Sequence, residues 1–173
     1  MEKITLKLFD ILNLEADING LVNQQNGEPL RKGLLSFPLP MTTKYWLTKL
    51  AKTVGEEKKI IDGLRDELVK KYGEEKDGQI IVPRVIPDLD KKGNPVKVMI
   101  KNAEGNDIEV DKMILNPVFL EFDKEYSEVL NQEKELEYRP FSLEDFKTKD
   151  NPNGLESEET YDTFFKLIKE LSE

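Results

Sequence analysis

The clearest pattern of apolar and polar positions lies between Thr43 and Tyr72, where apolar side chains recur at three- and four-residue steps among charged ones. This spacing predicts a long amphipathic helix, because residues three and four apart share one helix face. The stripe consists of Leu47, Leu50, Val54, Ile61, Leu64 and Leu68. A helix of about 30 residues spans roughly 45 Å, longer than a compact domain of this size needs. We therefore expect part of the stripe, with Leu64 and Leu68 as candidates, to contact another protein subunit.

Shorter patterns on both sides of this helix predict strands. Residues 4–8 alternate between apolar and polar, and helical spacing follows to about residue 22. Beyond the long helix, three strand-like runs are separated by glycine-containing loops, and we expect them to form a small antiparallel β-meander. The runs are 79–86, 96–101 and 108–115. Pro83 and Pro87 predict that the first run is an edge strand or an interrupted one, because proline donates no backbone hydrogen bond.

Two further amphipathic helices are predicted after the strands. Asn116-Pro117 supplies an N-cap and a first-turn proline for a helix that reaches about residue 132. Residues 157–171 predict a last helix with its apolar side chains on one face. The expected fold class is therefore α+β, with two main amphipathic helices against the small antiparallel β-meander and a C-terminal amphipathic helix.

The C-terminal helix is expected to be a docking element. We expect a single domain over residues 1–146, a linker over 147–156 and the docking helix over 157–173, because Asn151-Pro152-Asn153-Gly154 favours turns. A helix of about 15 residues is marginal alone. Its apolar face therefore needs cover from its own domain, a sister subunit or another protein, and the sequence leaves these alternatives open. The candidate contact residues on that face are Tyr161, Phe164, Phe165 and Ile168.

Trp46 is a further candidate contact residue, because tryptophan is enriched at binding hot spots. Tryptophan is also common in protein cores, and burial within the monomer is the alternative for this residue.

Composition removes most catalytic and cofactor chemistry. The 173 residues include neither cysteine nor histidine, so thiol nucleophiles, imidazole bases and the usual zinc and haem ligands are missing. The loop from Asp88 begins like a calcium loop, but Lys92 and Met99 occupy positions that need oxygen ligands, which favours a hairpin turn. Close carboxylate pairs carry no signal in a chain with 35 acidic residues. We expect no enzyme, cofactor or metal; an enzyme using a carboxylate acid–base pair is the weakest alternative.

Charge and hydropathy bear on the partner. The formal net charge is −9, which repels phosphate backbones, so we expect no nucleic-acid partner. A surface that mimics DNA is the less favoured alternative. No apolar run approaches the roughly 20 residues that cross a bilayer, and the first residues do not resemble a signal peptide. We therefore expect a cytosolic protein without a membrane partner.

Four motifs resemble those of small uncharacterised proteins encoded by tailed bacteriophages and prophages, over residues 40–146. They are Thr43-Lys44-Tyr45-Trp46-Leu47-x-Lys49-Leu50-Ala51-Lys52, Lys70-Lys71-Tyr72-Gly73, Phe119-x-x-Phe122-x-x-Glu125-Tyr126 and Tyr138-x-Pro140-Phe141-Ser142-Leu143-Glu144-Asp145-Phe146. The resemblance implies a phage origin, a place in the virion or the host cytoplasm, and no catalytic residues to transfer. The function it implies is a structural or accessory virion component that forms oligomers with itself or with other virion proteins. A small acidic inhibitor of a host defence protein is the alternative.

Overall fold

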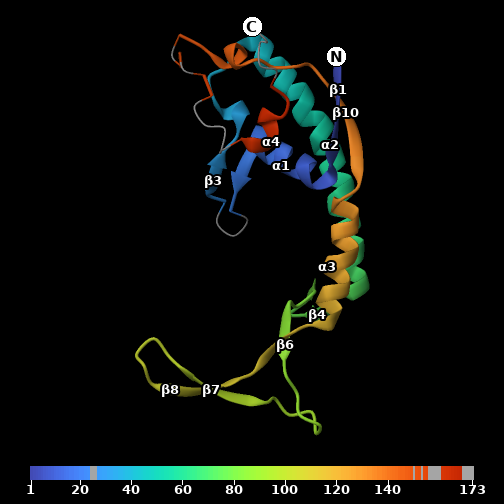
Figure 1. Ribbon diagram of the computed structural model, residues 1–173, viewed down its shortest axis with the longest axis vertical. Helices are drawn as coiled ribbons and strands as arrows, with labels where there is room; N and C mark the ends of the chain where they lie inside the picture. Colours follow the sequence, from blue (N-terminus) through green and yellow to red (C-terminus); the bar gives the residue numbers. More distant parts are fainter. Residues whose placement is uncertain (24–26, 150, 153, 156–160, 169–173) are drawn as a thin grey trace. The chain divides into compact units, whose positions relative to one another are not determined.

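A computed structural model of the protein describes residues 1–23, 27–149, 151–152, 154–155 and 161–168. These residues form helices and short antiparallel strands, so the expected α+β class is confirmed (Figure 1). The chain divides into two compact units. Unit 1 consists of Met1–Gly63 with Val129–Glu173, and unit 2 of Leu64–Glu128. This division differs from the single domain expected over residues 1–146, because the strands of the middle segment pair only with one another.

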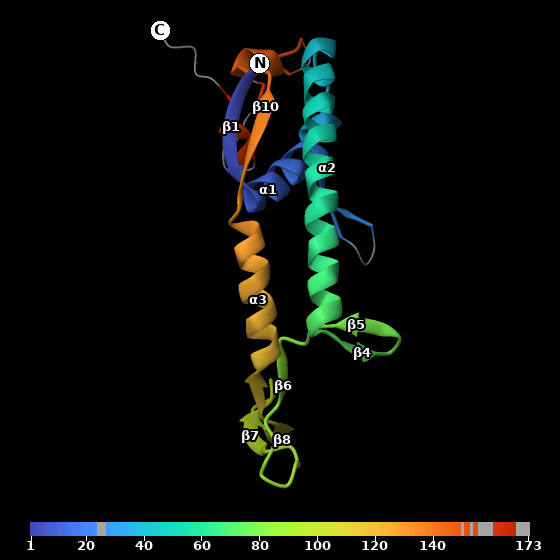
Figure 2. The ribbon, with the colours of Figure 1, turned by 90° about the vertical axis from the view of Figure 1, so that its right-hand side faces the viewer.

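Unit 1 begins with a strand and a helix, as the sequence predicts. Strand β1 (Glu2–Lys7) leads directly into helix α1 (Leu8–Asn19), and β1 pairs antiparallel with β10 (Glu133–Tyr138), which lies beside it in Figure 2. The pairing places Ile4 opposite Leu136. A second antiparallel pair, β2 (Gly20–Val22) with β3 (Pro29–Lys32), follows α1.

The core of unit 1 gathers apolar side chains from both ends of the chain. Its buried members come from β1, α1, β10, the 3-10 helix η1 (Leu34–Ser36), the first two thirds of α2 (Met41–Tyr72), the 3-10 helix η2 (Leu143–Phe146) with Phe141 just before it, and the C-terminal segment, residues 161–168. They are Leu6, Ile11, Leu14, Ile18, Leu34, Leu47, Leu50, Val54, Leu136, Tyr138, Phe141, Phe146, Tyr161, Phe164 and Leu167. The predicted long helix is therefore confirmed, and the N-terminal part of its stripe is buried in unit 1.

The C-terminal segment docks on its own chain. Helix α4 (Asp162–Phe165) packs beside α1, and the Phe164 ring lies 5.3 Å from Phe141 and 5.5 Å from Phe146 between ring centroids. The expected docking helix spans 157–173, of which only residues 161–168 lie within the described part of the chain. Among these, the α-helix is limited to four residues.

The expected linker forms a local turn in its described residues. The amide of Thr148 donates to the carbonyl of Asn151 at 2.9 Å, and the side-chain amide of Asn151 donates to the carbonyl of Gly154 at 2.9 Å. Gly154 is buried, and its φ of +71° lies in the left-handed region that glycine favours. Leu155 packs against the core of unit 1. The described part of 147–156 is therefore a packed turn and differs from a free linker.

Unit 2 contains three separate strand pairs and the first part of helix α3 (Pro117–Leu130). The pairs are β4 (Glu74–Lys76) with β5 (Gln79–Ile81), β6 (Val85–Pro87) with β9 (Met113–Leu115), and β7 (Lys97–Lys101) with β8 (Asp107–Asp111). The three runs therefore do not form the expected meander. Pro83 lies between β5 and β6, so the first run is interrupted as its prolines predict, and its two halves pair with different strands.

No helix among the described residues has the length and apolar character needed to cross a membrane.

Candidate protein-interaction surface

Unit 2 folds without a buried apolar core. All of its residues are described, and only one of them, the polar Asn116, is buried. Many of its large apolar side chains are exposed, and we call this set the apolar surface of unit 2. It consists of Leu64, Ile80, Val85, Leu89, Met99, Ile100, Ile108, Met113, Ile114, Leu115, Val118 and Leu120. Extended exposure of apolar side chains on a folded protein is typical of a binding surface.

Strands β7 and β8 form a two-stranded hairpin (Figure 1). Its residues form an apolar face and a charged face. Successive side chains of a strand point to opposite faces, so the cross-strand pairs Val98 with Val110 and Ile100 with Ile108 share one face. Ile100 is 46% exposed and Ile108 is 39% exposed. The opposite face carries the charged residues. An amphipathic hairpin of this kind is normally covered on its apolar face. In the described chain, Val98 and Val110 are half-buried, whereas Ile100 and Ile108 stay exposed.

The β6–β9 ribbon is apolar on both faces. Val85 faces Leu115, Ile86 faces Ile114, and Pro87 faces Met113. A two-stranded ribbon is at best marginally stable in water, and it gains stability when its apolar side chains pack against another surface. A partner that covers the β6–β9 ribbon therefore buries more apolar area, and stabilises the ribbon more, than it would with a hairpin that has one polar face.

The ribbon is joined to α3 through Asn116, whose side chain is buried. Its amide nitrogen donates to the carbonyl of Pro83 at 2.8 Å, and its Oδ1 accepts the amide hydrogen of Val118 at 3.0 Å. The second contact is the N-cap predicted from the sequence. The first contact fixes the start of α3 next to the chain that enters β6.

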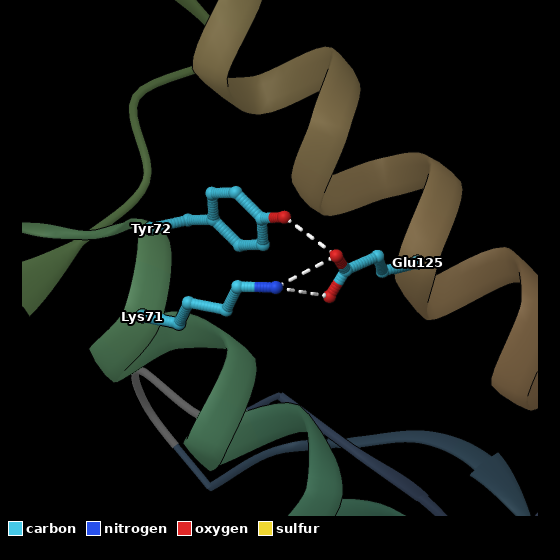
Figure 3. Close-up of polar contacts among 3 residues, drawn as sticks. All are labelled: Lys71, Tyr72 and Glu125. Carbon is cyan, nitrogen blue, oxygen red and sulfur yellow. Dashed lines mark hydrogen bonds and ion pairs between the residues drawn. The ribbon is translucent and has the colours of Figure 1, made fainter.

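A polar cluster ties the end of α2 to α3 within unit 2 (Figure 3). The Lys71 ammonium donates to the two carboxylate oxygens of Glu125 at 2.7 and 2.8 Å, and the Tyr72 hydroxyl donates to the same carboxylate at 2.7 Å. The hydrogen bond between Lys71 and Glu125, with a further contribution from Tyr72, raises the pKa of Lys71 and lowers the pKa of Glu125. Both groups are thus held in their charged forms. They are solvent-exposed, so they orient the two helices more than they stabilise the fold.

Aromatic side chains pack around this cluster. The Phe122 ring lies 6.5 Å from Tyr72, 6.1 Å from Phe119 and 6.0 Å from Tyr126, between ring centroids. The guanidinium of Arg84 lies 6.0 Å from the Phe119 ring. Two of the motifs that carry the phage resemblance, around residues 70–73 and 119–126, therefore contact each other in space.

Gly73 is required at the end of α2 by the close approach of other atoms. A Cβ at this position would lie 2.4 Å from the carbonyl oxygen of Val69 and 2.5 Å from a methyl group of Ile80. The glycine therefore lets β4 and β5 leave the helix directly, which places Ile80 and Ile81 beside the aromatic side chains. An open cavity of about 420 Å³ results, and its lining residues are Arg65, Asp66, Val69, Ile80, Ile81, Val82, Phe119 and Phe122.

The seven contact residues named from the sequence fall into two groups. Tyr161 and Phe164 are buried in unit 1, and Phe165 and Ile168 pack against the same core, so unit 1 itself covers the face predicted for docking. Trp46 is half-buried against this core as well. Leu64 and Leu68 lie in unit 2, where Leu64 is 38% exposed and Leu68 is half-buried. The two groups belong to different units, and Leu64 is the member that belongs to the apolar surface of unit 2.

The apolar face of the hairpin and the β6–β9 ribbon were missed as contact surfaces. The alternation of apolar and charged residues within 97–101 and 107–111 predicts the two strands. It does not show that these two strands form a sheet without a third one. The missing information is the pairing partner of each strand, which depends on residues distant in sequence.

One buried carboxylate of unit 1, that of Asp17, has a raised pKa and serves a structural role. Asp17 is buried; its Oδ1 lies 2.8 Å from the Arg31 guanidinium, and its Oδ2 accepts the amide hydrogen of Phe164 at 2.9 Å. Burial raises the pKa of the Asp17 carboxyl, against the opposing effect of these two partners. The hydroxyl of Tyr161 donates to the carbonyl of Lys32 at 2.9 Å. These contacts anchor the C-terminal segment to α1 and β3.

Two acidic residues from close carboxylate pairs of the sequence, Glu135 and Asp145, have separate partners. Glu135 pairs with Lys3 at 2.7 Å, and Asp145 accepts the amide hydrogen of Ser142 at 2.9 Å as part of a capping box. Across the described ranges, no group of three or more acidic side chains is placed to hold a metal ion. The loop that begins like a calcium site is a turn in which Asp90 accepts the amide hydrogens of Lys92 at 2.7 Å and Asn94 at 3.0 Å.

No protein-family model, curated protein or solved structure matches the chain.

Proposed function

We propose that this protein is a non-enzymatic structural component of a bacteriophage particle and binds other protein subunits through unit 2. The observation that carries the proposal is the composition of unit 2, in which large apolar side chains lie on the surface and no apolar side chain is buried. The phage setting rests on the motif resemblance described above.

A partner gains free energy by covering the exposed apolar side chains of unit 2. These side chains are each 37–63% exposed, and a standard interface takes roughly 800 Å² of surface from each partner. Burial of apolar area stabilises a complex by about 25 cal/mol per Å², from which the entropy lost on association is subtracted. Coverage of these side chains therefore favours the binding of a protein partner.

The charge distribution favours a protein partner. The exposed face of the β7–β8 hairpin carries both signs, with Lys97 paired to Asp111, and the whole chain has a net charge of −9. A nucleic-acid site would need a uniformly basic surface, which the hairpin does not have.

Unit 1 completes its own core, which leaves unit 2 as the part that needs a partner. The last described residues of the chain fill the core of unit 1 with Phe164 and Leu167. We therefore assign folding stability mainly to unit 1 and assembly to unit 2.

Incorporation into particles tests the proposal. The double variant Ile100→Asp/Ile108→Asp places charges on the apolar face of the hairpin, and we expect it to be lost from purified virions while the soluble protein keeps the fold of unit 1. Leu30→Asp is the matched control, because Leu30 is an equally apolar, exposed strand residue of unit 1. Incorporation of the double variant at the level of the control would refute the assignment of unit 2. Absence of the wild-type protein from virions, together with a stable complex with a host protein, would favour the inhibitor.

A further inference from the structure

We propose that the β7–β8 hairpin joins successive copies of this chain by edge-to-edge strand pairing, with β8 of one copy beside β7 of the next. This inference rests on the proposed function and specifies the partner as a second copy of the same chain. Two observations support the inference: the free backbone groups along the edges of β7 and β8, and the opposite signs of the charges on these two edges.

Both strands present an unpaired edge, since the sheet contains β7 and β8 alone within the described chain. The amide of Asn102 donates to the carbonyl of Asn106 at 2.9 Å, and the amide of Lys112 donates to the carbonyl of Val96 at 2.7 Å. These two bonds fix which cross-strand pairs are hydrogen-bonded within the hairpin. Because bonded and non-bonded pairs alternate in an antiparallel ladder, the intervening residues direct their N–H and C=O groups outward.

The outward-directed residues define two edges of opposite charge. The β7 edge consists of Lys97, Met99 and Lys101, and the β8 edge consists of Asp107, Glu109 and Asp111. Each edge carries charges of a single sign. Within the hairpin these residues already face one another, Lys97 opposite Asp111 and Lys101 opposite Asp107.

A second copy reproduces this pairing. When β7 of the next copy lies antiparallel to β8, the same lysines again face the same aspartates, and the free N–H and C=O groups of both edges pair. The apolar side chains of the two hairpins then continue on one face, where Ile100 of one copy reaches Ile108 of the next. A strand that fits the β7 edge must alternate acidic and apolar residues, and β8 has this pattern.

The contact is heterologous, because β7 and β8 are different surfaces. Such a contact forms a ring when the rotation between copies closes, and an open filament when it does not. In a ring every copy uses both strand edges, and in a filament every copy except the two at the ends does so.

A charge-exchanged variant tests the edge pairing without removing it. Lys97→Asp/Lys101→Asp/Asp107→Lys/Asp111→Lys keeps opposite charges across the hairpin and between identical copies, so we expect it to assemble with itself. Beside wild-type chains it places lysine against lysine and aspartate against aspartate. We therefore expect the two proteins to sort into separate assemblies when they are co-expressed with different tags, with mixed species largely missing by native mass spectrometry.

The control exchanges an ion pair of unit 1 in the same way. Lys3→Glu/Glu135→Lys reverses an exposed pair across β1 and β10, and this variant should mix freely with wild-type chains. A second variant, Met99→Pro, removes one outward N–H of the β7 edge and should abolish assembly while the unfolding midpoint of unit 1 is unchanged.

Free mixing of the charge-exchanged protein with wild type, or normal assembly of Met99→Pro, would overturn the edge pairing and leave the proposed function intact. A wild-type protein that is monomeric at every concentration would also overturn it, and the edge charges would then act to keep strands apart. The proposed function is decided separately, by incorporation of the protein into virions.

Discussion

Replacing Phe164 with alanine should destabilise unit 1 by about 3 to 5 kcal/mol, the range for a buried phenylalanine. The side chain is 0% exposed, and its ring packs between Phe141 and Phe146 at centroid distances of 5.3 and 5.5 Å. Because the amide of the same residue is bonded to Asp17, the backbone cannot move freely to fill the cavity. The expected loss should therefore lie toward the upper end of that range.

Chemical denaturation followed by tryptophan fluorescence measures this loss, because Trp46 is the single tryptophan and packs against the same core. Phe9→Ala is the matched control, since Phe9 is 53% exposed on α1. We expect the control to change the free energy of unfolding by no more than about 0.5 kcal/mol. If Phe164→Ala lowers the free energy of unfolding by less than about 1 kcal/mol, the docking of the C-terminal segment on its own chain is refuted, because removal of a buried ring destabilises a protein by more than this.

Three further predictions concern pH, the helix stripe and the helix end. Since burial raises the pKa of the Asp17 carboxyl, the stability that this group contributes is present at low pH and is lost as the pH rises through the raised pKa. In an acid titration, the unfolding free energy of the wild type relative to Asp17→Asn should therefore fall as the pH rises. A difference in unfolding free energy that does not depend on pH would contradict this prediction. Leu64→Ala/Leu68→Ala should destabilise the unassembled chain by less than about 4 kcal/mol, because neither residue is fully buried, and a larger loss in urea titrations would show that both are covered. Gly73→Ala should lower the thermal unfolding midpoint, because an added Cβ would contact neighbouring atoms too closely. Gly63 has open space around it, so Gly63→Ala should stabilise α2 by up to about 1 kcal/mol. Equal shifts of the thermal midpoint in the two variants would refute the role given to Gly73.

Local patterns in the sequence predict the local elements of this fold well. The long helix is expected over Thr43 to Tyr72 and observed over Met41–Tyr72, because its stripe has the helical period throughout. The hairpin around Gly105 is also predicted, and the glycine has the positive φ of +82° that its turn requires. These features depend on residues that are neighbours in the chain.

Long-range pairing could not be predicted in the same way. The strand at residues 2–7 pairs with the strand at 133–138, and no local signal joins two segments that distant. Asp17 was not singled out, since one buried carboxylate cannot be distinguished among 35 acidic residues before its partners Arg31 and Phe164 are placed. The exposure of unit 2 is equally invisible in the sequence, because its apolar residues have the same spacing as those of a buried sheet.

Amide hydrogen exchange on the assembled and the dissociated protein tests the role of unit 2 most directly. We predict that assembly slows exchange at the amides of 97–101 and 107–111, whereas the amides of α1 in unit 1 exchange at the same rate in both states. Slower exchange confined to unit 1, with no change in the β7–β8 hairpin, would contradict it.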